Sequence, residues 1–151
     1  MEDDRSDSET MKVRHDPELE ERGRMNAEVR KAHEFQEFIT PEGCFILELA
    51  NDEGDPRLSI SRARVPVGVT TEWHELADTD ERYVIVSGEG FVEVGSFAPI
   101  EVRSSDIVWI PANTQQRIRN SGREDLIFMC ICTPRFRPES YVPIAKAEIG
   151  G

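Results

Sequence analysis

The sequence predicts an all-β domain, a sandwich or barrel built from about ten short strands. Short segments rich in Val, Ile and Phe recur between residues 35 and 133. Gly, Pro, Ser and Asp residues interrupt them at intervals of about ten positions. No helical pattern of apolar residues separates these segments, which excludes an alternation of strands and helices. The length of 151 residues suits one domain with a hydrophobic core.

An acidic extension, residues 1–33, is expected to precede this domain, which would span residues 34–151. Residues 1–15 show no apolar periodicity and are expected to be disordered. A short helix is expected from Asp16-Pro17 onward, because proline suits the first turn of a helix and good helix formers follow it. The extension is therefore predicted to be disordered or to form a short helix.

The stretch Gly68–Gly90 is the most informative part of the chain. Two strand-forming segments flank an acidic turn, Ala77–Asp80, and we expect them to pair as a hairpin. In such a hairpin, His74 on the first strand and Glu81 on the second converge on one point. An imidazole and a carboxylate that converge in an apolar cavity form either a metal site or a buried ion pair, and the pattern leaves both open.

Composition limits the possible partners. The net charge of -12 argues against nucleic acid, because phosphate binding relies on clusters of Lys and Arg. The three cysteines are too few for a disulfide framework and are expected to be reduced, buried thiols. No apolar run approaches membrane-spanning length and the acidic N-terminus is unlike a signal peptide, so we expect a cytoplasmic protein that has no membrane partner.

Glycine, histidine and glutamate residues occur at regular spacings in the central stretch. Five residues separate Gly68 from His74, and six separate Glu81 from Gly88. This spacing resembles the first sequence motif of the cupin family, small β-barrels of jelly-roll topology. That motif consists of Gly, five residues, His-x-His, three or four residues, Glu, six residues and Gly. Leu76 stands at the position of its second His.

A second segment further along the chain resembles the family's second motif, which consists of Gly, five residues, Pro-x-Gly, two residues, His, three residues and Asn. Pro111 and Asn120 match this motif. Ser105, Asn113 and Gln116 stand where the two glycines and the histidine would be. The two motifs, in this order, imply a cupin-type β-barrel with jelly-roll topology.

The resemblance also implies a divalent metal such as Fe, Mn, Ni or Zn, whereas no nucleotide cofactor is expected. Metal-binding cupins hold the metal with three His and one Glu, and carrying those positions over leaves His74, Glu81 and Gln116 as metal ligands. An amide oxygen is a weaker ligand than an imidazole for transition metals. The alternative is a metal-free, hydrogen-bonded polar cluster of the same three residues inside the barrel.

Fold alone does not define the activity, because the cupin family contains many kinds of enzyme and binding protein. We expect a metal-dependent enzyme that acts on a small organic molecule in the barrel pocket, such as a dioxygenase, isomerase or decarboxylase. The alternatives are a non-catalytic module that binds or senses a small molecule, and a metal-free isomerase or epimerase in which His74 and Glu81 transfer protons.

Three further residues, Tyr83, Arg62 and Trp73, are candidates for substrate binding. The alternative for Trp73, as for Trp109, is packing, because large aromatic side chains contribute most to cores. The alternative for Arg62 is a solvated strand face or a dimer contact. The expected partners are a small-molecule ligand and a second copy of the chain, since small members of the resembled family usually form homodimers.

Overall fold

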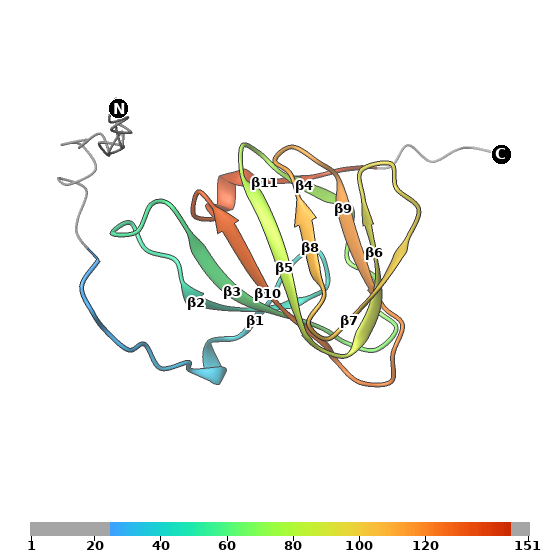
Figure 1. Ribbon diagram of the computed structural model, residues 1–151, viewed down its shortest axis with the longest axis horizontal. Helices are drawn as coiled ribbons and strands as arrows, with labels where there is room; N and C mark the ends of the chain where they lie inside the picture. Colours follow the sequence, from blue (N-terminus) through green and yellow to red (C-terminus); the bar gives the residue numbers. More distant parts are fainter. Residues whose placement is uncertain (1–24, 146–151) are drawn as a thin grey trace, which may run out of the picture.

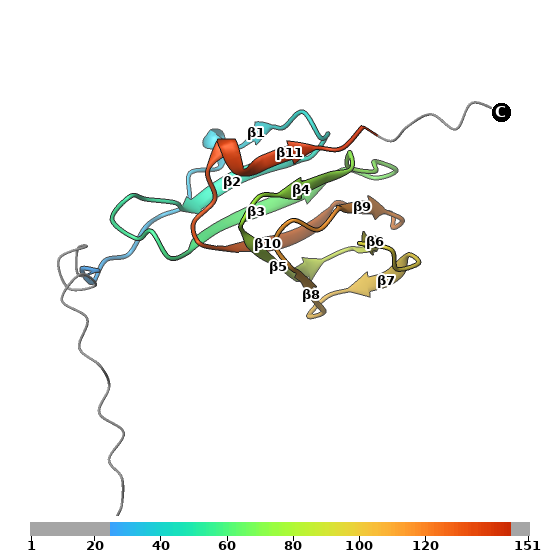
Figure 2. The same ribbon diagram turned by 90° about the horizontal axis from the view of Figure 1, so that it is seen from above.

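The computed structural model describes residues 25–145, which form two antiparallel β-sheets (Figures 1 and 2). The first sheet has six strands in the order β1-β2-β3-β10-β5-β8, with the bounds Phe38–Ile39, Phe45–Ala50, Ser59–Val65, Leu126–Thr133, Asp80–Ser87 and Ile107–Ile110. The second has five strands in the order β11-β4-β9-β6-β7, with the bounds Tyr141–Pro143, His74–Leu76, Gln116–Asn120, Glu89–Val94 and Ile100–Arg103. The predicted all-β, jelly-roll architecture is therefore confirmed.

Helical structure in the described residues is limited to two short 3-10 turns, Glu34–Gln36 and Pro138–Ser140. The helix expected after Asp16-Pro17 is absent from residues 25–33, which run as irregular chain outside the sheets (Figure 1). Its beginning and the expected disordered segment, residues 1–15, lie outside the described residues. Within residues 25–145, no helix has the length and apolar character needed to cross a membrane.

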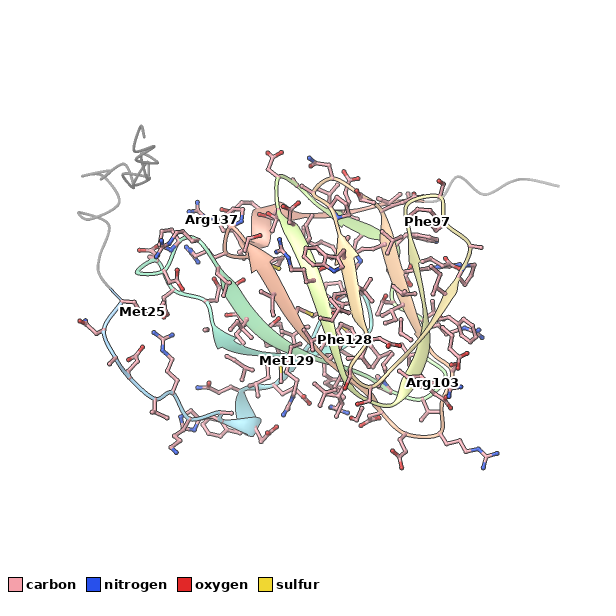
Figure 3. All side chains as sticks on the ribbon, viewed as in Figure 1. Met25, Phe97, Arg103, Phe128, Met129 and Arg137 are labelled. Atoms are coloured by element: carbon pink, nitrogen blue, oxygen red, sulfur yellow. The ribbon has the colours of Figure 1, made fainter. Side chains whose placement is uncertain are left out.

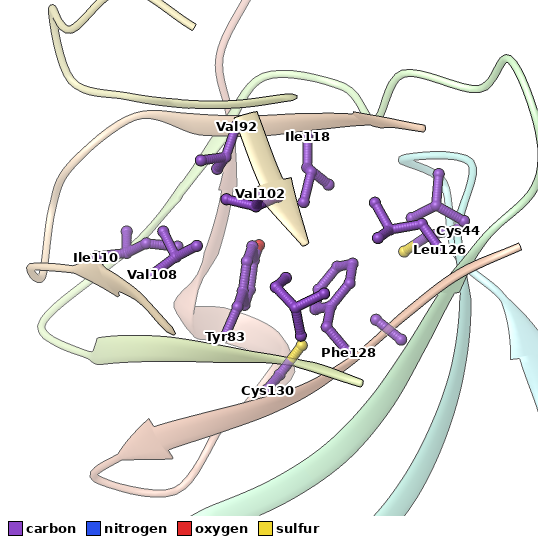
Figure 4. Packing of buried hydrophobic residues seen from close by; sticks show 13 residues of the cluster. Cys44, Tyr83, Val92, Val102, Val108, Ile110, Ile118, Leu126, Phe128 and Cys130 are labelled. Atoms are coloured by element: carbon purple, nitrogen blue, oxygen red, sulfur yellow. The ribbon is translucent and has the colours of Figure 1, made fainter. Parts of the chain in front are cut away.

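The core lies between the inner faces of the two sheets and follows from the two-residue periodicity of the strands. Along β10, Leu126, Phe128, Cys130 and Cys132 are buried, whereas the residues between them, such as Met129, are only partly buried (Figure 3). Figure 4 shows Phe128 and Cys130 packed among branched aliphatic side chains of both sheets. Burying a Val, Leu, Ile or Phe side chain completely stabilises a fold by about 1.5–3 kcal/mol relative to leaving it exposed.

The strands β4 and β5 do not pair with each other, so the expected hairpin is wrong. Strand β4 pairs with β9 and β11 in the second sheet, and β5 pairs with β10 and β8 in the first. The turn between them, which holds Asp78 at a φ of 52°, carries the chain from one sheet to the other. His74 and Glu81 nevertheless converge, because each lies on the inner face of its own sheet and is buried there.

Two turns keep the backbone geometry of the cupin glycines although the glycines themselves are absent. Ser105 has a φ of 75° and Asn113 a φ of 59°, and both stand at glycine positions of the second motif. In both residues the β-carbon comes close to the following carbonyl, but asparagine tolerates the left-handed conformation better than serine because its side chain forms local hydrogen bonds. The structure thus supports the motif alignment at the level of the main chain and indicates local strain at Ser105.

We expect Ser105→Gly to raise the free energy of unfolding by about 0.5–1 kcal/mol, because the relief of strain exceeds the added chain entropy of glycine. Urea unfolding monitored by tryptophan fluorescence measures the change. The control is Ser96→Gly, at an exposed turn position that is not among the residues with positive φ, and it should destabilise by about 0.5 kcal/mol. Equal destabilisation by both substitutions would contradict the strain at Ser105.

Candidate functional site

A cavity of about 390 Å³ is lined by residues of both sheets. Its walls are mostly apolar and aromatic, with contributions from β2, β3, β5 and β10 of the first sheet and from β4, β9 and β11 of the second. The ionisable side chains in the lining, thiols apart, are Glu42, Glu48, His74, Glu81, Tyr83 and Tyr141. An apolar cavity of this size with a few convergent polar groups has the properties of a small-molecule site.

His74 is held in place at the inner face of β4, where it is 5% exposed. Its Nδ1 lies 2.9 Å from the carbonyl oxygen of Glu72 and 3.0 Å from Oε2 of Glu42. The Nδ1–H group is shared between two acceptors, the carbonyl of Glu72 and Oε2 of Glu42. The imidazole also stacks on the ring of Tyr141, with 5.0 Å between centroids. Ring position and tautomer are both fixed by these contacts.

Glu81, on β5 of the opposite sheet, is fixed by a chain of hydrogen bonds. Gln116 donates from Nε2 to Oε1 of Glu81 over 2.9 Å, and the hydroxyl of Tyr83 donates to Oε1 of the same glutamine. The thiol of Cys132 approaches Oε2 of Glu81 at 3.6 Å. Because Tyr83 and Glu81 belong to β5 and Gln116 to β9, this chain connects the two sheets.

Burial shifts the protonation of both central groups. Loss of hydration raises the pKa of Glu81, and the hydrogen bond from Gln116 and the charge of His74 oppose that shift only in part. Burial is the largest single influence and would lower the pKa of His74. The hydrogen bond and charge of Glu42, the carbonyl of Glu72 and the charge of Glu81 together outweigh it, so the pKa of this imidazole is raised. Both groups therefore retain a proton to a higher pH than they would in water.

The structure brings four of the six predicted site residues together: His74, Glu81, Gln116 and Tyr83. Gln116 lies behind the wall of the cavity rather than in it, where its side-chain amide bonds Tyr83 and Glu81. Within the predicted polar cluster, the side chain that donates to Glu81 is that of Gln116.

The remaining predicted residues, Arg62 and Trp73, are not among the cavity's lining residues. Arg62 donates to Glu34 and Glu37 from the outer face of β3. The ring of Trp73 lies beneath the guanidinium of Arg117, 4.5 Å away. The packing role considered for Trp109 is wrong, because this residue is 69% exposed on β8.

Glu42 is a site residue that sequence reasoning missed. It lies in the turn between β1 and β2, where the pattern Thr40-Pro41-Glu42-Gly43 indicated only a change of direction. The turn is tied to the segment before β4, because the amide of Glu72 donates to the carbonyl of Glu42. Turn composition has no periodicity that would assign the side chain to the cavity, so no sequence signal could have found it.

The donor atoms present do not fit a transition-metal site. Leu76 replaces one imidazole, and Oε1 of Gln116 already accepts a hydrogen bond from Tyr83, with the Nε2 group turned toward Glu81. Within residues 25–145, no three His, Cys, Asp or Glu side chains are grouped so that they could hold a metal ion. Two of the three expected ligands, Gln116 and Glu81, are instead hydrogen-bonded to each other, whereas His74 bonds the carbonyl of Glu72.

Known proteins share this architecture. A crystal structure from Thermotoga maritima, described as a predicted oxalate decarboxylase, is similar with a TM-score of 0.64 and 18% identity, covering 71% of this chain and 99% of that one. A Klebsiella pneumoniae protein with a double-stranded β-helix domain is similar with a TM-score of 0.64 and 15% identity, covering 79% of this chain and 100% of that one. The Streptomyces protein Pac13, described as a nucleoside dehydratase, is similar with a TM-score of 0.63 and 17% identity, covering 78% of this chain and 92% of that one. No family model matches the sequence.

The sheet order and these similarities show that the chain has the double-stranded β-helix fold, the cupin-type barrel that the sequence predicts. Within that fold it belongs to the same family as the uncharacterized protein MJ1618 of Methanocaldococcus jannaschii. The two are 32% identical over 104 residues, which cover 68% of this chain and 82% of that protein.

We expect Glu81→Gln to change how stability depends on pH. The folded-state pKa of Glu81 is raised above the ordinary value of 4.5, so unfolding releases a proton and the wild-type unfolding free energy falls as pH rises from 4.5 through that pKa. Glutamine cannot ionise and removes this loss, and a difference of one pH unit between the folded and unfolded pKa values corresponds to about 1.4 kcal/mol. The unfolding free energy of the variant minus that of the wild type should therefore increase with pH and then level off.

Urea unfolding at a series of pH values measures this difference between variant and wild type. The control is Glu75→Gln, on the same strand as His74 but pointing away from the core. The unfolding free energy of this control should differ from that of the wild type by the same amount over the whole pH range. A difference for Glu81→Gln that is equally flat would show that the pKa of the buried carboxyl group is the same in the folded and unfolded chain.

Proposed function

We propose that the protein is an enzyme that binds a small organic molecule in the cavity and transfers protons to and from it without a metal. The observation that supports this most is the placement of His74 and Glu81. They are buried, come from opposite sheets and line the same cavity. Two ionisable groups on either side of a bound ligand are placed to act as general acid and general base. Glu42 acts as a positioning residue through its contact with Nδ1 of His74.

His74 is suited to proton exchange with a ligand through Nε2, because the Nδ1–H is directed to the carbonyl of Glu72. Glu81 has a raised pKa, so it can supply a proton and take one back. One group removes a proton from carbon while the other protonates an oxygen or the opposite face of that carbon. The first case gives elimination of water or enolisation, and the second gives epimerisation.

A metal-dependent reaction, the first expectation from the sequence, is less well supported because the side-chain amide of Gln116 is engaged in hydrogen bonds. The likeness to Pac13 is one of fold, so it supports the view that the same barrel can hold an enzyme of this general kind. That protein is described as a nucleoside dehydratase, and dehydration is one of the reactions expected from a paired acid and base.

Solvent proton exchange tests the proposal. The enzyme is incubated in D2O with uridine and a panel of small hydroxy and amino carbonyl compounds, and NMR follows deuterium incorporation or alkene formation. We expect turnover of at least one class of compound. The rate should fall about 10²-fold or more in His74→Gln and Glu81→Gln, and Glu75→Gln should keep the wild-type rate. Chelation by EDTA should leave the rate unchanged.

Two outcomes would overturn this proposal. Activity that EDTA removes and Fe, Mn, Ni or Zn restores would establish the metal-dependent enzyme instead. Binding of panel compounds without any exchange or turnover would establish the non-catalytic binding module.

We also propose that the protein is a homodimer. Strand β8 is an edge of the six-stranded sheet, and its outward side chains Ile107 and Trp109 are 55% and 69% exposed. Val86 on the neighbouring strand β5 adds to this apolar surface. Symmetric pairing of two β8 edges would bring these side chains of both copies into contact on one continuous sheet and provide partners for the edge backbone.

Light scattering coupled to size exclusion should give a dimer for the wild type and a shift to monomer for Trp109→Lys, because the substitution places a charge in the contact. The control is Phe97→Lys, which changes an equally exposed aromatic residue in the turn between β6 and β7. A monomeric wild type, or equal association of all three proteins, would refute the β8 interface.

A further inference from the structure

We infer that the ligand of this cavity is an organic amine, bound as its ammonium ion through Glu42 and Glu81 and carrying an apolar, preferably aromatic, body. The inference depends on the part of the proposed function that places the ligand in this cavity. It does not depend on proton transfer.

Charge in the lining favours a cation. Three carboxyl groups line the cavity, those of Glu42, Glu48 and Glu81. No Lys or Arg is found among the described residues of the lining, and the one basic side chain, His74, already contacts Glu42. A carboxylate or phosphate ligand would therefore lose its hydration without gaining a free cationic partner, which is strongly unfavourable in an apolar cavity.

The arginines of the surrounding strands do not correct this imbalance. Arg62 and Arg64 bond Glu37 on the outer face of the first sheet. Arg82 donates to Thr133 and lies over Trp109, and Arg135 donates to Asn51. None of the four is in the lining.

The two inner carboxyl groups retain capacity to accept hydrogen bonds. Oε2 of Glu42 is fully buried, and the one donor near it, the Nδ1–H of His74, is shared with the carbonyl of Glu72. Oε2 of Glu81 has only the thiol of Cys132, a weak donor. Buried carboxyl oxygens of this kind need donors, and an ammonium group supplies three.

The same two groups influence each other electrostatically. Burial is the main cause of the raised pKa of Glu81, and the hydrogen bond from Gln116 and the charge of His74 oppose it. The negative charge of Glu42 raises this pKa further, so the two carboxyl groups repel each other within the cavity. An ammonium ion between them would reduce this repulsion. Cation binding would accordingly release the proton from Glu81, so the affinity for an amine should rise with pH.

The rest of the cavity suits an apolar body. Tyr83 and Phe128 pack together with 4.3 Å between their ring centroids, and both line the cavity with Tyr141, Phe38 and Phe136. Aromatic faces attract cations and bind flat apolar groups. A volume of about 390 Å³ accommodates a single-ring amine with room for substituents.

Matched probe sets test the inference by binding alone. Amines, alcohols and carboxylates that share one body, such as phenethylamine, 2-phenylethanol and 3-phenylpropionate, with indole and cyclohexyl counterparts, are titrated into the wild-type protein and followed by amide shifts in NMR. The amines should bind about tenfold tighter than the alcohols, and the carboxylates weakest, because a charge-assisted hydrogen bond is gained or lost. The affinity for amines should increase with pH.

Variants assign the preference to particular residues. Glu42→Gln and Glu81→Gln should each bring the affinity for amines down to that for alcohols while leaving alcohol binding nearly unchanged. Glu75→Gln is the control and should behave as the wild type. Thermal unfolding checks that each variant is folded, and the ranking of probes by the wild type stands independently of them.

Two results would overturn the inference: carboxylates that bind as tightly as the amines, or no binding of any amine at millimolar concentration. Amine binding without turnover would instead leave the inference in place and remove the proposed catalysis. The failure of one can thus be distinguished from the failure of the other.

Discussion

The hydrogen-bond chain from Tyr83 through Gln116 to Glu81 joins the two sheets across a mostly apolar interior. Gln116 is fully buried, and both ends of its amide are occupied, so the glutamine has one orientation. A buried polar group that loses its partner costs about 1–3 kcal/mol, so any rearrangement of these three side chains is opposed by the other two. The position of Glu81 in the cavity, and with it the geometry opposite His74, depends on this link between the sheets.

The positions that match the metal ligands of the cupin motifs make other contacts in this structure. In a metal-binding cupin, the residues at these positions point their donor atoms at a common centre. Here Leu76 is buried in the cavity wall, Gln116 supports Glu81, and the imidazole of His74 is fixed by Glu42 and Glu72. What remains in the cavity is a set of acidic groups between aromatic walls. That environment suits proton transfer and cation recognition better than Lewis-acid chemistry.

Sequence reasoning predicted the fold well because strand periodicity is a local property. The alternation along β5 placed Glu81 and Tyr83 on one buried face, and the structure agrees. The pairing of β4 with β5 was wrong, because a short acidic turn is compatible both with a hairpin and with a crossing between sheets. Glu42 and the outward position of Trp109 could not be predicted, since each depends on how distant segments meet and not on the residues beside it.

The left-handed turns at Ser105 and Asn113 bear on how proteins of this kind are recognised. A glycine in a motif records a dihedral angle, and selection acts on the angle as long as some residue can adopt it. When serine or asparagine takes over, the letters of the motif disappear while the path of the chain persists. Comparison by backbone conformation does not depend on those letters, and it finds the same fold in proteins that are only 15–18% identical.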